Sequence, residues 1–273
     1  VCRNDWIPHV YPRRRAAARP ALRLADAALA DAVASVLPAT PARTDVVVTD
    51  CLDDRVFADL DAGRTVILNY HRDQPGNRTA LPAILDRFKP CIWDRGSHLG
   101  GVIEADWLRL ALGGGRFFDK RCYDLIEGAC KINLDLAPFP VYEVVWGVDK
   151  PVRDRMKGLI HGIKDFLPAD TLRNFSYLFS LRVGGGTLWV CTFRFAAAAT
   201  DPATAACLTA ILDHAPRQTP AHAVSLGDLQ AWCRKTAENG PLVEDVMNRF
   251  WEQDNRPVED TLFWEEAKVD LSR

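Results

Sequence analysis

The chain has 273 residues, of which 48% are hydrophobic and 26% are charged, with 34 Lys and Arg against 36 Asp and Glu. This length suits one large domain or two small ones, and the formal net charge of -2 gives no electrostatic reason to expect nucleic acid or an anionic membrane as a partner. No apolar run approaches the ~20 residues that a membrane-spanning helix needs.

The first residues contain neither a starting Met nor the apolar core of a signal peptide. We therefore expect a piece of a longer protein, whose localisation, in the bacterial cytoplasm or secreted, stays open. The composition, rich in Ala and Arg, suits a GC-rich bacterial genome.

Residues 1–20 include an aromatic stretch and the basic run Arg13 to Arg15, which together indicate an exposed link. After this link, Asp26 is placed to cap a helix that buries Leu29 and Val33 and ends before Pro38.

A β-α-β unit is the clearest structural prediction. The β-branched run 45–49 is followed by a helical pattern over 52–62, a stop at Gly63 and a second apolar run over 65–70. Runs that are apolar on both faces are typical of a parallel sheet covered on both sides. Residues 88–93 and 141–146 are further strand candidates.

Glycines 184–186 join two β-rich runs, 176–183 and 187–195, which predicts a hairpin. Helices are expected from Pro202, and then over 226–238 and 243–252. The tail aromatics are expected to dock on a neighbouring surface; they are Phe250, Trp251, Phe263 and Trp264.

Eight cysteines are scattered singly, without a zinc-binding spacing. We expect buried free thiols, including Cys51, Cys191 and Cys207, which fall inside apolar elements. Cys51 is also a candidate nucleophile, because it follows a strand at the start of a helix, where a thiol pKa can fall. No nucleophile-elbow sequence surrounds it, and no base is evident.

A candidate carbohydrate site consists of Trp93, Asp94 and His98, which follow a predicted strand and combine an aromatic ring with polar groups. The alternative is a buried Trp93 beside solvated loop residues. No metal site and no cofactor are expected, because His71 and Asp73 are too few for a metal and Gly113 to Gly115 lack the remainder of a phosphate-binding loop.

The sequence contains four stretches that are informative when taken together: Asn4 to Pro12, Val46 to Asp54, Ala62 to Leu68 and Arg182 to Cys191. Together they resemble the C-terminal accessory region of glycoside hydrolase family 2 proteins, the relatives of β-galactosidase and β-glucuronidase. The resemblance covers most of residues 4–215.

The resemblance implies three parts. Residues 1–20 would be the end of a preceding immunoglobulin-like domain and a linker, and residues 21–217 an α/β domain that is flavodoxin-like or glutamine-amidotransferase-like and has lost its nucleophile. The expected fold is thus a flavodoxin-like parallel-core sheet with a C-terminal β-hairpin. Residues 218–273 would be a helical extension, which the resemblance does not explain.

In the family the catalytic acid/base is a Glu that follows an Asn on a barrel domain, and this chain has no Asn-Glu dipeptide. No catalytic residue is therefore expected here. The chain would be a scaffold or would shape the substrate entrance, while the barrel of the parent hydrolyses O-glycosidic bonds. Its partners would be the barrel and immunoglobulin-like domains, and homo-oligomer contacts stay open.

Two alternatives remain. The chain could be an independent amidotransferase-like enzyme that uses Cys51, or a carbohydrate-binding module built around Trp93.

Overall fold

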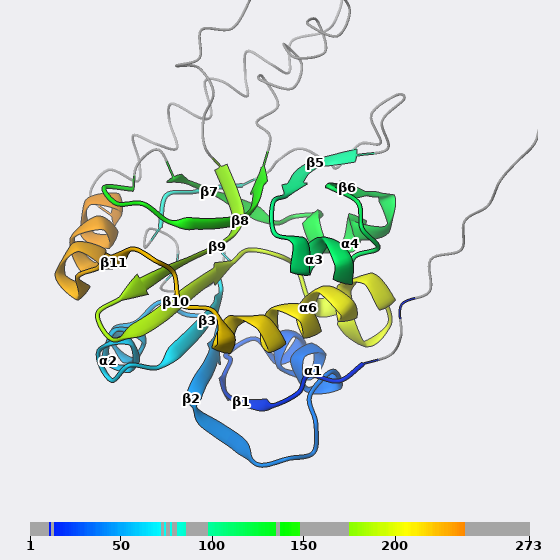
Figure 1. Ribbon diagram of the computed structural model, residues 1–273, viewed down its shortest axis with the longest axis horizontal. Coiled ribbons are helices and arrows are strands. Elements are labelled where there is room, and N and C mark those ends of the chain that lie inside the picture. The colour runs from blue at the N-terminus through cyan, green and yellow to red at the C-terminus, as the bar shows by residue number, and fades with distance from the viewer. Residues whose placement is uncertain are drawn as a thin grey trace, which may run out of the picture.

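The computed structural model describes residues 11, 14–71, 74, 77, 81–85, 98–134, 137–147 and 175–237. These residues form a mixed β-sheet with helices against both of its faces, as Figure 1 shows. The α/β class expected from the sequence is confirmed.

The described strands and helices have the following bounds. The strands are β1 (Arg19–Arg23), β2 (Ala42–Thr49), β3 (Thr65–Asn69), β4 (Ala83–Leu85), β5 (His98–Ile103), β6 (Phe117–Asp119), β7 (Cys130–Asn133), β8 (Tyr142–Gly147), β9 (Phe175–Val183), β10 (Gly186–Cys191) and β11 (Ala223–Val224). The α-helices are α1 (Ala27–Ser35), α2 (Asp54–Asp61), α3 (Asp106–Ala111), α4 (Tyr123–Ile126) and α6 (Pro202–His214), and residues 226–237 form another helix. Short 3-10 turns are η1 (Lys120–Cys122), η4 (Ala196–Ala199) and η5 (Ala215–Arg217).

The sheet has a parallel half and an antiparallel half. Its strand order is β1-β2-β3-β10-β9-β8-β5-β6. Neighbours from β1 to β10 pair in parallel, whereas neighbours from β10 to β6 pair antiparallel. Off this path, β11 and β7 pair with β9, and β4 pairs with β7.

The expected β-α-β unit is confirmed. Strands β2 and β3 pair in parallel from Val46 opposite Thr65 to Thr49 opposite Leu68. Between them, α2 is capped by Asp53, and Gly63 follows with φ of 79°, a conformation that glycine adopts without steric cost.

The expected hairpin is confirmed as well, but it occupies the centre of the sheet. Gly184 has φ of 56°, and a Cβ on Gly186 would lie 2.6 Å from the carbonyl oxygen of Arg64 and 2.7 Å from that of Leu60. The turn therefore lies against the end of α2, and β10 inserts between β9 and β3.

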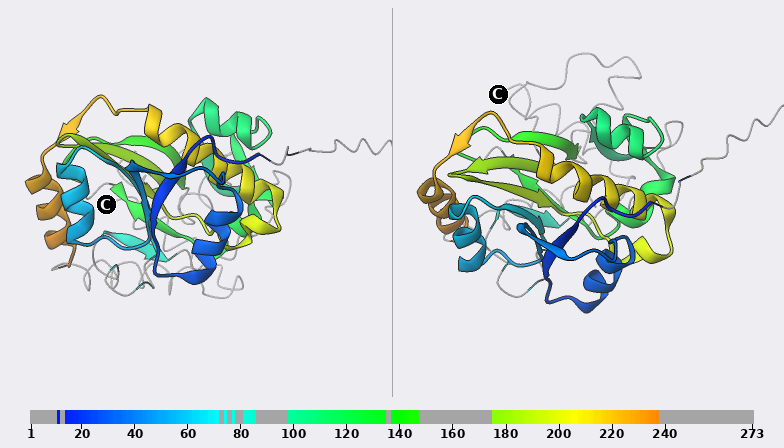
Figure 2. Two further views of the ribbon diagram at one scale, coloured as in Figure 1. Left: turned by 90° about the horizontal axis from the view of Figure 1, so that it is seen from below. Right: turned by 60° about the horizontal axis from the view of Figure 1, so that its bottom comes forward.

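Each face of the sheet has its own hydrophobic core, and the alternation of side chains along β10 separates them. Trp189 and Cys191 face the core shared with α1, α3 and α6, whereas Leu188 and Val190 face the core shared with α2 and the helix over 226–237. In Figure 2 the last two helices lie side by side.

The basic segment before residue 20 differs from the exposed link that we expected. Ala16 is buried in the first core, and β1 begins at Arg19 and pairs with β2. We predicted no helix or strand between His98 and Asn133 from the sequence, and expected only that the cysteines in that stretch would be buried.

Other expectations are confirmed or lie outside the described residues. Asp26 caps α1, Asp201 caps α6, and Ser225 Oγ accepts a hydrogen bond from the N–H of Asp228 at the start of the next helix. The strand predicted over 88–93, the helix over 243–252 and the tail aromatics lie outside those residues. Within the described part, no helix is both long and apolar enough to cross a membrane.

Candidate functional site

A cluster of polar side chains lies at the carboxyl ends of the parallel strands. Open α/β sheets bind ligands at this edge, so it is the first place to look for function. Its members come from the end of β2, from the end of β3 and from the residues that follow them; they are Asp50, Asn69, His71, Gln74 and Asn77. We call them the strand-end cluster.

Asp50 directly follows β2 and is 1% exposed. Its Oδ2 accepts hydrogen bonds from the backbone N–H groups of Ala25 and Asp26, each at 2.8 Å. It also accepts one from Gln74 Nε2 at 3.0 Å. Because Asp26 caps α1, the Asp50 carboxylate lies at the N-terminus of that helix, where a negative charge is favourable.

Asn77 is fully buried, and both the nitrogen and the oxygen of its side-chain amide form hydrogen bonds with backbone groups. Its Nδ2 donates to the carbonyl oxygen of Asp50 at 2.6 Å and to that of His71 at 3.3 Å. Its Oδ1 accepts from the N–H of Leu52 at 2.9 Å. One side chain therefore joins the segment after β2 to the segment after β3.

Asn69 makes the equivalent connection between β3 and β10. Its Nδ2 donates to the carbonyl oxygens of Cys191 at 3.1 Å and Phe193 at 3.0 Å. Its Oδ1 lies 3.0 Å from His71 Nε2. Because both Nδ2 protons are used, Oδ1 is the atom that faces the imidazole, and His71 Nε2 must carry the proton.

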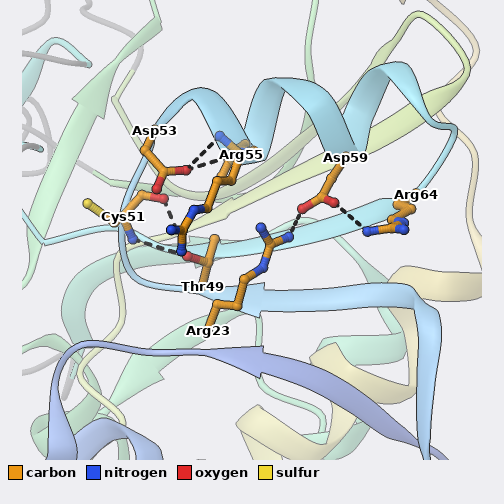
Figure 3. A network of polar contacts seen from close by, with 8 residues as sticks. Arg23, Thr49, Cys51, Asp53, Arg55, Asp59 and Arg64 are labelled. Atoms are coloured by element: carbon orange, nitrogen blue, oxygen red, sulfur yellow. Dashed lines mark hydrogen bonds and ion pairs between the residues drawn. The ribbon is translucent and has the colours of Figure 1, made fainter.

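Cys51 does not have the environment of an activated nucleophile. Burial raises the pKa of its thiol above the usual value, and the nearby carboxylates of Asp53 and Asp50 raise that pKa further. Helix α2 begins only at Asp54, and the Asp53 side chain accepts its first N–H groups, as Figure 3 shows. The helix N-terminus that was expected to lower the thiol pKa is thus satisfied by a carboxylate.

An ion-pair cluster stands beside these residues in Figure 3. Asp59 of α2 is nearly buried and pairs with Arg23 of β1 and with Arg64, whose Nη1 lies 2.6 Å from Asp59 Oδ1. Burial lowers the pKa of Arg23. These contacts attach α2 to the sheet edge, which is a structural role.

The predicted carbohydrate residues are only partly covered by the structure. Trp93 and Asp94 lie outside the described residues. The backbone of His98 begins β5 and pairs with Asp119 of β6. Since β5 runs antiparallel to β10, His98 lies at the same edge as the strand-end cluster, although three strands separate β5 from β3.

The buried thiols match the sequence interpretation. Cys122, Cys130, Cys191 and Cys207 are buried thiols that form no disulfide bond, and burial raises the pKa of Cys191 to about 12. Cys51 is half-buried in the loop after β2 and not inside an element. Among the residues the structure describes, no three His, Cys, Asp or Glu side chains gather where they could hold a metal ion.

The sequence analysis considered His71 only as an insufficient metal ligand and did not single out Asp50, Asn69, Gln74 or Asn77. The available signal was their position within a few residues after a predicted parallel strand. The chain belongs to the α/β class by its fold. No protein-family model matches the sequence, and no curated protein matches it either.

Proposed function

We propose that this chain is a non-catalytic α/β domain of a longer glycoside hydrolase related to family 2. In this proposal the domain is a flavodoxin-like or amidotransferase-like module that serves as a scaffold for the parent or shapes its substrate entrance. The family assignment rests on the four stretches that resemble the accessory region.

The observation that carries the non-catalytic role is the use of the strand-end side chains. The side-chain N–H groups of Asn69 and Asn77 all donate to backbone carbonyl oxygens, and Asp50 Oδ2 accepts from two backbone N–H groups. Catalytic groups need a free proton, lone pair or nucleophile aimed at substrate. These bonds fix loops, as a scaffold requires, although the buried Asp50 Oδ1 has no hydrogen-bond partner.

The flavodoxin-like part of the proposal is supported by the parallel half of the sheet. Strands β1, β2, β3 and β10 lie side by side in parallel, with α1 on one face and α2 on the other. Three of the four stretches behind the resemblance coincide with β2, with the end of α2 and β3, and with the β9–β10 turn, whereas Asn4 to Pro12 lies outside the described residues except for Tyr11. These three are thus core elements of this half.

The size of the native protein tests the proposal. An antibody raised against this chain should detect, in the source cells, a species much heavier than the chain itself. That species, captured on the antibody, should hydrolyse nitrophenyl galactosides or glucuronides, whereas the purified chain should not. A native species of the size of this chain, or hydrolysis by the chain alone, contradicts the proposal.

A further inference from the structure

Arg194 differs from the other partly buried arginines of the described chain. Five arginine side chains in that part of the chain are half-buried: Arg23, Arg64, Arg109, Arg121 and Arg194. The first four each pair with an aspartate carboxylate. The guanidinium of Arg194 forms no ion pair and no hydrogen bond with any residue that the structure describes. Within this group, its charge alone has no counterion among those residues.

The backbone of Arg194 is held firmly although its side chain is unpaired. Phe193 and Phe195 on either side are 0% and 3% exposed, and the N–H of Arg194 donates to the carbonyl oxygen of Leu125 of α4 at 2.9 Å. The guanidinium nitrogens keep some exposure to solvent. A dissolved ligand can therefore reach a cation whose attachment to the fold is fixed.

Gly128, which follows α4 with φ of 70°, lies beside this guanidinium. A Cβ at position 128 would be 3.8 Å from Nε and 3.8 Å from Nη2 of Arg194. An arginine binds both oxygens of a carboxylate side-on through these two nitrogens, as Arg121 does with Asp119. Because residue 128 is glycine, it has no side chain that covers this pair of donors.

Arg194 borders the strand-end cluster. Asn69 Nδ2 donates to the carbonyl oxygen of Phe193, the residue before Arg194. The turn that contains the glycine leads into Cys130, whose thiol donates to the carbonyl oxygen of Tyr70, the residue after β3, at 3.7 Å. Arg194 therefore lies beside the carboxyl end of β3, at the edge where open α/β sheets bind ligands.

The chemistry of this donor pair selects a carboxylate. The guanidinium is planar, and its Nε–Nη2 edge matches the two oxygens of a carboxylate, whose single negative charge one arginine neutralises. Phosphates are bound by several backbone N–H groups at a helix N-terminus or a nest. The adjacent carboxylate of Glu127 is exposed and accepts from the Tyr123 hydroxyl at 2.7 Å, so it is not the partner of Arg194.

We propose that Arg194 binds the carboxylate of a small organic acid side-on, through Nε and Nη2, at the edge beside Gly128. The ligand supplies the counterion that the other half-buried arginines find within the chain. This inference does not rest on the proposed function, since a domain without catalysis can hold such a ligand.

Titration of the full chain with sodium acetate, against sodium chloride at the same ionic strength, tests the proposal. The NMR signal of the Arg194 Nε–H group, identified by its loss in Arg194→Gln, should shift in a saturable way with acetate only. No saturable shift overturns the proposal, and this is the result expected if a carboxylate of the chain itself already pairs with Arg194.

The backbone amide signal of Gly128 gives the dissociation constant of acetate in the variants of Arg194. Arg194→Gln should raise this constant by about tenfold or more, because charge-assisted hydrogen bonds are lost. Arg182→Gln removes an exposed arginine of β9 and is the matched control, with an unchanged constant. Equal constants in Arg194→Gln and the unmodified chain overturn the proposal.

Substitution of Gly128 gives a second readout in which Arg194 stays intact. Asp and Asn tolerate positive φ better than other side chains, so Gly128→Asp and Gly128→Asn are a matched pair. The carboxylate introduced by Gly128→Asp lies beside the donor pair and should compete with acetate. The dissociation constant, followed on the Arg194 Nε–H signal, should be about tenfold or more above that of Gly128→Asn. Equal constants in the two variants contradict the proposal.

Discussion

The side-chain nitrogen of Asn69 lies 3.1 Å from the carbonyl oxygen of Cys191, so that one amide fastens the end of β3 to the end of β10. The same nitrogen reaches the carbonyl oxygen of Phe193, and the amide oxygen faces His71. All three interactions require an amide at position 69, with its nitrogen toward the two carbonyl oxygens and its oxygen toward His71.

Asn69→Asp should therefore destabilise the protein in a pH-dependent way. The substitution places an acidic oxygen against two carbonyl oxygens at a position that is 2% exposed, so burial and repulsion raise the pKa of the new carboxyl in the folded state. The loss should be smallest below the unfolded pKa of ~3.9 and should grow to about 3 kcal/mol as the pH rises above the folded pKa.

Urea denaturation at several pH values between 4 and 8 measures this effect. Thr40→Asp introduces the same charge at an exposed loop position and serves as the control, with little change in stability at any pH. A loss of stability in Asn69→Asp that does not vary with pH would show that the carbonyl oxygens do not act on the new carboxyl.

Cys51 should react slowly with alkylating agents at neutral pH. Because burial and two carboxylates raise its thiol pKa above the ordinary value of a cysteine, the thiolate fraction at pH 7 is below that of a free cysteine. The rate should rise about tenfold per pH unit until the pH exceeds 9. Peptide-level mass spectrometry after iodoacetamide pulses separates Cys51 from the other thiols, and glutathione gives the reference rate. A rate that levels off below pH 8 would restore Cys51 as a candidate nucleophile.

Asp59→Asn should weaken the attachment of α2 to the sheet. The substitution removes the charge that faces Arg23 and Arg64, whose side chains are 31% and 43% exposed, so solvent screening limits the loss to about 1–2 kcal/mol. Asp61→Asn on the same helix is exposed and should change stability by less than about 0.5 kcal/mol. Chemical denaturation compares the two variants, and equal stabilities would mean that the ion pairs contribute nothing.

The three glycines of the β9–β10 turn should respond differently to alanine. A Cβ at position 186 would meet backbone oxygens of Leu60 and Arg64, whereas a Cβ at position 185 would lie at an ordinary 3.5 Å from Gly63. Gly186→Ala should therefore cost about 2 kcal/mol or more, and Gly185→Ala well under 1 kcal/mol. Gly184→Ala meets no atoms but is strained by its φ of 56°, so it should cost about 1 kcal/mol. Thermal unfolding of the three variants gives the order directly.

Local patterns in the sequence were sufficient for elements whose partners are near in the chain. The valine run of β2, the Asp26 cap of α1 and the glycines before β10 each carry a signal of their own. By contrast, β1 spans only five residues, includes Pro20 and lies in a basic segment, so nothing local marks it as a strand. It is a strand because β2 pairs with it.

The sequence predicts at which edge of the sheet the strand-end cluster lies, but not which of its side chains bond to one another or to the backbone. Parallel strands implied that residues after β2 and β3 meet at one edge, and this follows from the pattern. The bond from Asn69 to Cys191 joins residues 122 positions apart, and Tyr11 reaches Leu112 over 101 positions. Such pairings depend on the strand order, which local periodicity does not contain.

The central position of β10 also constrains how the protein folds while it is being made. Strands β1, β2 and β3 are synthesised first, but the other neighbour of β3 does not exist until the chain has reached Cys191. Until then β3 presents unpaired backbone groups along an apolar strand, which is a template for association with other chains. Nascent chains shorter than this are expected to need a chaperone, and the completed hairpin closes the sheet in one late step.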